Sequence, residues 1–124
     1  MATSGMQLQD GGNRVADSSL ASAQYCAVKQ TTTPRTVTLA NTGGEAIAGV
    51  LQNTPAAGQA AIIAQRGITQ AQIGTGGVTA GDQLMTETTT GKFVTKTSTN
   101  AVVGVAIETV AAGGVGTIDL GASG

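Results

Sequence analysis

The sequence feature that most limits the possible folds of this chain is a segment that occurs twice. Residues 49–63 read GVLQNTPAAGQAAII, and residues 104–118 read GVAIETVAAGGVGTI. Each copy is a short apolar run, an Ala-Ala-Gly turn and a second apolar run, which is the pattern of a strand–turn–strand unit. The residues of the first copy that recur 55 positions later are Gly49, Val50, Thr54, Ala56, Ala57, Gly58 and Ile63. A repeated hairpin without catalytic residues indicates a structural building block.

Four glycines of the repeat are expected to determine the fold. Gly49 and Gly104 lie inside apolar runs, where glycine is typical of a tight bend or a close approach between backbones. Gly58 and Gly113 lie in the two turns. Bends at equivalent positions would curve one sheet, so we expect the two copies to be two related walls of one small barrel.

The composition predicts a small core and association with other chains. The chain has 124 residues, which favours a single domain, and only 2% of them are aromatic. The core must therefore be built from Val, Ile, Leu and Ala, which bury less area per side chain than aromatic residues do. The single cysteine, Cys26, cannot form an internal disulfide. Small domains without a stabilising cross-link such as a disulfide often depend on oligomerisation.

The pattern between residues 23 and 124 is that of an all-β domain. Short segments of alternating polarity are separated by Gly, Pro and Asn turns, and one stretch, residues 69–73, has room for a single helical turn. The expected strands cover residues 25–28, 36–40, 46–52, 60–65, 83–86, 92–97, 102–108 and 115–120. Such regularly spaced short strands are typical of a small β-barrel or sandwich.

Residues 1–22 differ from the rest and are interpreted as an extended N-terminal arm. The segment is polar and contains Gly-Gly, so it buries too little apolar surface to order by itself. One interpretation is an unstructured terminus. The other is an arm that orders against a neighbouring subunit through its isolated apolar residues, which are Met6, Leu8, Val15 and Leu20.

The residues that carry enzyme chemistry are sparse. The chain has no histidine, which excludes a Ser-His-Asp or Cys-His arrangement within one chain. Cys26 is expected to be a buried structural residue, and Glu108 and Asp119 are expected to be solvated surface charges although they could be neighbours. No motif for a cofactor or a metal ion is complete, and Gly91-Lys92 lacks the remaining residues of a phosphate loop. We therefore expect no enzyme, no cofactor and no metal site.

Charge and hydropathy give no sign of nucleic-acid or membrane binding. Six basic and seven acidic residues give a net charge of −1, and the basic residues form no stripe. The sequence contains no apolar run of membrane-spanning length and no charged start followed by an apolar stretch. The chain is expected to be made and assembled in the cytoplasm.

The C-terminal part resembles the capsid decoration, or cement, proteins of tailed bacteriophages. The resemblance covers residues 45–121 and follows a family pattern in which G-D-x-L precedes V-V-G-x-A-x-E and a final V-x-L. The segments that carry it are AGDQL (80–84), GKFV (91–94), VVGVAIET (102–109), AAGG (111–114) and VGTIDL (115–120). The arm at residues 1–22 lies outside the resemblance.

The resemblance implies a β-tulip type of barrel that is trimeric and bound to the outer capsid surface of the virion. Its partners would be the major capsid protein, its own copies in a homotrimer and neighbouring decoration subunits. Such a trimer would stabilise the expanded shell by bridging adjacent capsid subunits. The alternative is a secreted or surface β-rich binding module of the adhesin or carbohydrate-binding type, although the sequence lacks the aromatic residues that sugar sites use.

Overall fold

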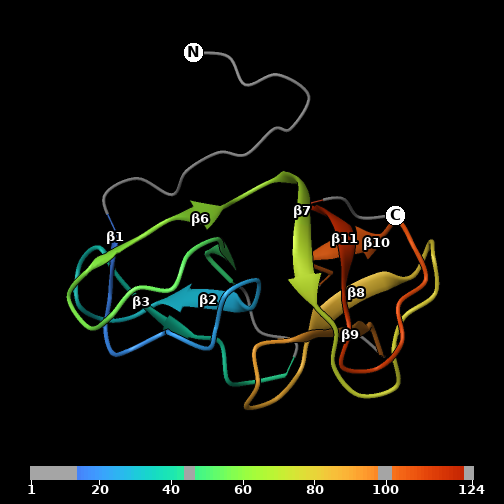
Figure 1. Cartoon of the computed structure of the whole chain (residues 1–124), viewed down its shortest axis with the longest axis horizontal. Coiled ribbons are helices and arrows are strands. Elements are labelled where there is room, and N and C mark those ends of the chain that lie inside the picture. Colours follow the sequence, from blue (N-terminus) through green and yellow to red (C-terminus); the bar gives the residue numbers. More distant parts are fainter. Residues whose placement is uncertain (1–13, 44–46, 98–101, 122–124) are drawn as a thin grey trace.

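The computed structural model describes residues 14–43, 47–97 and 102–121, and within these ranges the secondary structure is entirely β. The predicted fold class, all-β and barrel-like, is therefore confirmed (Figure 1). The strands are β1 (Arg14–Ala16), β2 (Ala27–Gln30), β3 (Thr36–Leu39), β4 (Gly49–Leu51), β5 (Ala60–Ala61), β6 (Ile63–Ala64), β7 (Gly67–Gln72), β8 (Gln83–Thr86), β9 (Phe93–Thr95), β10 (Gly104–Ala106) and β11 (Val115–Leu120).

The first sheet closes on itself. Its strand order is β5-β1-β3-β2-β4-β6, so its two ends are β5 and β6. These two strands are consecutive in the chain and are separated only by Ile62. The β5–β6 segment therefore pairs with β1 through its first half and with β4 through its second half. This pairing closes a small five-stranded barrel.

The second sheet is built in the same way. Its strand order is β7-β11-β10-β8-β9, and a parallel bridge between Ile73 and Phe93 joins the end of β7 to β9. Figure 1 shows the two barrels side by side, with β1, β2 and β3 in one and β7 to β11 in the other. The cyclic order of the strands is the same in both when β1 to β4 are matched with β7 to β10 and the β5–β6 segment is matched with β11.

The register of the repeated hairpins is identical. In each barrel the closing hairpin pairs the same residues when positions are shifted by 55. The pairs are Val50↔Ala64 and Leu51↔Ile63 in the first barrel, and Val105↔Asp119 and Ala106↔Ile118 in the second. The segment repeated in the sequence thus forms the same hairpin in both barrels.

The equivalence between the two barrels extends beyond the repeated segment to their other strands. Pairing between β2 and β3 recurs between β8 and β9, and the parallel contact of β1 with β3 recurs at the bridge after β7. The equivalent pairs are Val28↔Leu39 with Leu84↔Thr95, and Ala16↔Val37 with Ile73↔Phe93. The chain therefore consists of two copies of one barrel. The expectation that the repeats are two walls of one barrel is wrong, because each repeat closes a barrel of its own.

Each barrel has its own apolar interior. Val28 and Val37 lie in the core of the first barrel, and their equivalents Leu84 and Phe93 lie in the core of the second. The second core also includes residues from the outer face of the first barrel, which are Ala27, Ala40, Val50 and Ala64. Small side chains on that face let the two barrels pack closely together.

Backbone hydrogen bonds also join the barrels. The Ala27 N–H donates to the carbonyl of Gly91 at 2.7 Å, and the Gln72 N–H donates to the carbonyl of Tyr25 at 2.9 Å. The Gln72 side-chain amide donates to the carbonyl of Gln24 at 2.7 Å. The interface between the barrels is thus specified by polar geometry as well as by packing.

The secondary structure predicted for residues 69–73 is wrong. Residues 69–73 were expected to have room for a helical turn, but they lie in β7 and the bridge that follows it. β7 pairs with β11 over its whole length, from Gly67↔Leu120 to Gln72↔Val115. The alternation of buried Thr69 and Ala71 with exposed Gln70 has the two-residue period of a strand.

Candidate functional site

The residues predicted to anchor the arm are separated by the structure. Met6 and Leu8 lie outside the described residues. Val15 is half-buried in β1, opposite Thr36 of β3 and Ala60 of β5. Leu20 is 4% exposed in the core of the first barrel, and its N–H donates to the carbonyl of Pro55 at 2.9 Å.

These positions divide the predicted arm. The part that the structure describes, from Arg14 onward, is a strand of the first sheet followed by a buried core residue. The Leu20 side chain is covered by its own chain and is not available to a neighbouring subunit in this conformation. A contact with another subunit therefore has to come from residues before Arg14 or from the barrel surface.

Gly49 and Gly104 occupy equivalent points of close approach between strands. A methyl group at Gly104 would lie 2.8 Å from the carbonyl oxygen of Asp119. At Gly49 it would meet the carbonyl oxygen of Ala64, which is the equivalent atom of the first barrel. A backbone atom cannot move aside as a flexible side chain does, so both positions require glycine.

Gly58 and Gly113 occupy equivalent turns. Their φ angles are 80° and 81°. Each turn is closed by a matching hydrogen bond, from the Gln59 N–H to the Ala56 carbonyl at 2.9 Å and from the Gly114 N–H to the Ala111 carbonyl at 3.0 Å. A positive φ at the third residue of a turn favours glycine.

Cys26 is in a poor environment for nucleophilic chemistry. Burial raises the pKa of its thiol to about 11, and the nearby charge of Lys92 opposes this shift only in part. A thiol with that pKa is protonated at neutral pH, and the thiolate is the nucleophile.

Glu108 and Asp119, which the sequence suggested could be neighbours, have different surroundings. Asp119 pairs with Val105 in the β10–β11 ladder. A carboxylate oxygen of Glu108 accepts the N–H of Thr117 at 2.8 Å. Asn53, the equivalent residue of the first barrel, accepts the N–H of Ile62 at 3.0 Å through its side-chain oxygen. Glu108 therefore completes the strand ladder in the same way as Asn53.

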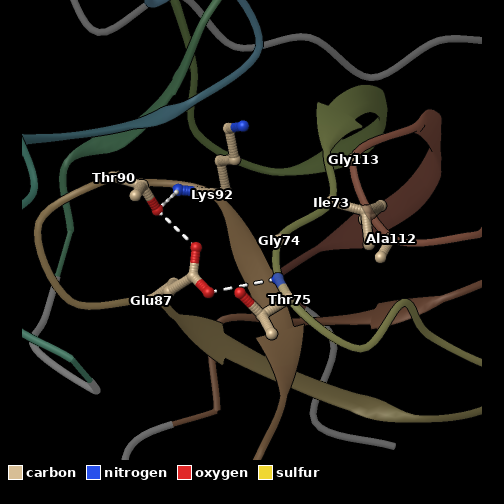
Figure 2. Close-up of a pocket in the computed structure, with 8 residues that line it drawn as sticks. All are labelled: Ile73, Gly74, Thr75, Glu87, Thr90, Lys92, Ala112 and Gly113. Atoms are coloured by element: carbon tan, nitrogen blue, oxygen red, sulfur yellow. Dashed lines mark hydrogen bonds between the residues drawn. The ribbon is translucent and has the colours of Figure 1, made fainter.

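A pocket lined by polar groups, which the sequence analysis did not single out, lies in the second barrel. It is open to solvent, has a volume of about 440 Å³, and lies between the loop after β7, the β8–β9 turn and the β10–β11 turn. Figure 2 shows Glu87 and Thr75 on one side and Ala112 and Gly113 on the other. No sequence motif signals it, because its residues come from three separate loops.

Glu87 is held in place by its neighbours in this pocket (Figure 2). One carboxylate oxygen accepts the Thr90 hydroxyl at 2.6 Å, and the other accepts the Thr75 N–H at 3.1 Å. Hydrogen bonds from Thr90, and then from Thr75, lower the pKa of Glu87. A methyl group at Gly74 would lie 2.6 Å from the carboxylate. Glu87 thus clamps the loop after β7 to the β8–β9 turn.

Three large apolar side chains among the described residues are exposed. Ile62 is 50% exposed between β5 and β6, Ile107 is 46% exposed at the end of β10, and Val115 is 51% exposed at the start of β11. Isolated apolar side chains are ordinary on a protein surface. They are candidates for contacts with other chains where the local backbone also offers unpaired groups.

Within the described ranges no cluster of three or more His, Cys, Asp or Glu residues has the arrangement of a metal site. The same ranges contain no helix long and apolar enough to span a membrane.

The comparisons with known proteins give a likeness of fold. No protein-family model matches the chain, and no curated protein sequence matches it. The crystal structure of the N base of head fiber gp8.5 in bacteriophage phi29 is similar to this chain, with a TM-score of 0.68 and 17% sequence identity. The match covers 90% of this chain and 92% of that chain. At this level of identity the likeness is one of fold.

Proposed function

We propose that the chain is a structural protein of a bacteriophage virion that attaches to the outside of the head. The observation that carries the proposal is the likeness to the base of a head fiber, because it spans nearly the whole of both chains. The resemblance of residues 45–121 to capsid decoration proteins, which rests on different grounds, supports the same class of protein.

We further propose that the chain forms a trimer, and that this trimer bridges adjacent major capsid subunits at three-fold positions. The small cores of the two barrels, with Phe93 as the largest fully buried side chain, favour stabilisation through association. A ligand that binds the expanded shell and not the unexpanded one stabilises the expanded shell by mass action. Many identical contacts over a shell add avidity to each weak one.

The contacts with the capsid are assigned to the surface of the barrels and to the residues before Arg14. Residues 14–65 of the sequence carry Arg14, Lys29 and Arg35 against two acidic residues, Asp17 and Glu45. This local excess of positive charge would favour an acidic surface on the partner.

The heat resistance of expanded heads tests the bridging role. Heads stripped of surface proteins are heated with and without a saturating amount of the purified chain, and DNA release is followed by dye fluorescence. Bridging raises the temperature of release. An unchanged temperature at full occupancy would exclude stabilisation while leaving attachment intact. The mass of the purified chain by light scattering tests the trimer separately.

A further inference from the structure

The β8–β9 turn carries two charges that the equivalent turn of the first barrel lacks. The Glu87 N–H donates to the Lys92 carbonyl at 2.8 Å, and the Thr31 N–H donates to the Thr36 carbonyl at the same distance. Glu87 and Lys92 are therefore the equivalents of Thr31 and Thr36. Because the first barrel forms the same hairpin bond with two threonines, the fold of a barrel does not require this pair of charges.

The two charges line the same pocket without neutralising each other. Glu87 and Lys92 both border the cavity of about 440 Å³, and residues opposite one another in a hairpin direct their side chains to one face. Within the described ranges the Lys92 ammonium forms no hydrogen bond or close ion pair, and Figure 2 shows it directed away from the carboxylate. The pocket thus offers an acceptor and a separate donor.

The Glu87 carboxylate is fixed in place, and its acceptor capacity is only partly used. The Thr90 hydroxyl donates to one oxygen and the Thr75 N–H donates to the other. A carboxylate has about four acceptor positions, so it can accept further bonds from a ligand. A group that is already held in place loses little freedom when a ligand binds, which favours affinity.

The electrostatics of the pocket favour a ligand without net charge. An anion would meet the carboxylate of Glu87, and a cation would meet the ammonium of Lys92. Anion sites made from backbone need several free N–H groups that converge on the ligand. Four residues that line the pocket already donate their N–H groups within the chain, and these are Gly74, Thr75, Lys92 and Gly113. The groups that remain for a ligand are therefore mainly the two side chains.

We propose that this pocket binds a neutral sugar residue. Neighbouring hydroxyls of the sugar donate to the Glu87 carboxylate, and an oxygen of the ring or of a hydroxyl accepts from the Lys92 ammonium. The small residues Ala112 and Gly113 on the opposite side contact the C–H groups of the ring (Figure 2). The cavity volume is within the usual range of small-ligand sites, which is about 300–1,000 Å³. Hydrogen bonds thus take the part that stacking on aromatic residues has in other sugar sites.

NMR titration of the full chain tests the site directly. Backbone amide shifts of the labelled protein are followed while glucose, galactose, mannose or N-acetylglucosamine is added. The comparison probes are glucuronate, glucosamine and a neutral capped tripeptide. We expect saturable shifts at Thr75, Glu87 and Gly113 with at least one neutral sugar, at lower concentrations than with any comparison probe.

Two pairs of variants connect the shifts to the pocket. Ala112→Leu fills the pocket from its uncharged side and should abolish the saturable shifts. Its control, Ala57→Leu, changes the equivalent exposed turn residue of the first barrel and should leave them unchanged. Glu87→Gln should weaken sugar binding by about tenfold, since a hydrogen bond to a charged acceptor is lost. Its control is Glu108→Gln, which lies outside the pocket.

Three results would overturn the proposal. The first is the absence of saturable shifts at the pocket residues with every neutral sugar. The second is tighter binding of a charged probe or of the tripeptide than of all the neutral sugars. The third is equal sugar affinity of Ala112→Leu and Ala57→Leu, with melting temperatures showing that both are folded.

The sugar site and the proposed attachment to a phage head are tested separately. The same variants are pelleted with phage heads in the absence of sugar. Sugar binding without pelleting would contradict the virion role alone. Pelleting without sugar binding would contradict the sugar site alone.

Discussion

Glycine at positions 49 and 104 sets how closely neighbouring strands approach in the two barrels. The contact that a Cβ would make at Gly104 is with backbone atoms of Asp119 and Leu120. Gly113 differs, because nothing lies within 4 Å of its Cβ position and only its positive φ favours glycine. The same residue type thus serves two physical purposes in one hairpin.

Substitution separates these two purposes. We expect Gly104→Ala to lower the free energy of unfolding by about 1–3 kcal/mol, the usual cost of forcing extra volume into a packed site. Gly113→Asn is the control and should cost much less, since asparagine tolerates a left-handed backbone. Urea unfolding measures both. A Gly104→Ala variant as stable as the parent would refute the close-approach argument.

Glu87 predicts a specific acid sensitivity. Its pKa is lowered by hydrogen bonds from Thr90 and Thr75. The lowered pKa means that the carboxylate stabilises the fold above the ordinary glutamate pKa, and that this contribution is lost as the pH falls through the folded-state value. Glu87→Gln should therefore reduce the loss of melting temperature below about pH 4.5, with Glu108→Gln as the comparison. Identical acid profiles for the parent and Glu87→Gln would contradict this.

At the scale of elements, the closing hairpins were predictable and the duplication was not. The two copies of the repeated segment are separated by a constant 55 positions, so they are visible when the sequence is aligned with itself. Elsewhere the offset changes: Val28 corresponds to Leu84 at 56, and Ala16 corresponds to Ile73 at 57. Single-residue length changes and substitutions among apolar residues of different size hide this equivalence from the sequence.

The strands β8 and β11 were predicted with their observed bounds, 83–86 and 115–120, because clear turn signals flank them. The pocket around Glu87 could not be predicted, since Thr75 reaches Glu87 only through the closure of the second barrel. The contact of Glu87 with Thr90 is local to the β8–β9 turn. Leu20 was assigned to the arm because the polar residues 17–19 before it and Ser22 after it make the surrounding segment look solvent-exposed.

The segment between β1 and β2 belongs to the first barrel through Leu20. We expect Leu20→Ala to lower the free energy of unfolding by about 2–5 kcal/mol, as removal of a buried leucine side chain does in well-packed cores. Val15→Ala should cost less, because Val15 is only half-buried. If Leu20→Ala unfolds like the parent in urea but fails to form oligomers, Leu20 is an intersubunit anchor and the core assignment is wrong.

At the scale of the whole molecule, two fused barrels form the described body, and we propose that the residues before Arg14 contact neighbouring copies. Deletion of residues 1–9 should leave the melting temperature of the monomeric barrels within about 2 °C, since each barrel has its own core. The same deletion should lower the mass measured by light scattering. A deletion of residues 1–20 should instead unfold the first barrel, because it removes β1 and Leu20.

The proposed attachment to the outside of a phage head is tested most directly by co-sedimentation. The purified chain is mixed over a range of concentrations with expanded phage heads that have been stripped of surface proteins, and with unexpanded heads. We expect saturable binding to the expanded heads and little to the unexpanded ones. Binding that never rises above the level of an unrelated small β protein would contradict the proposed attachment.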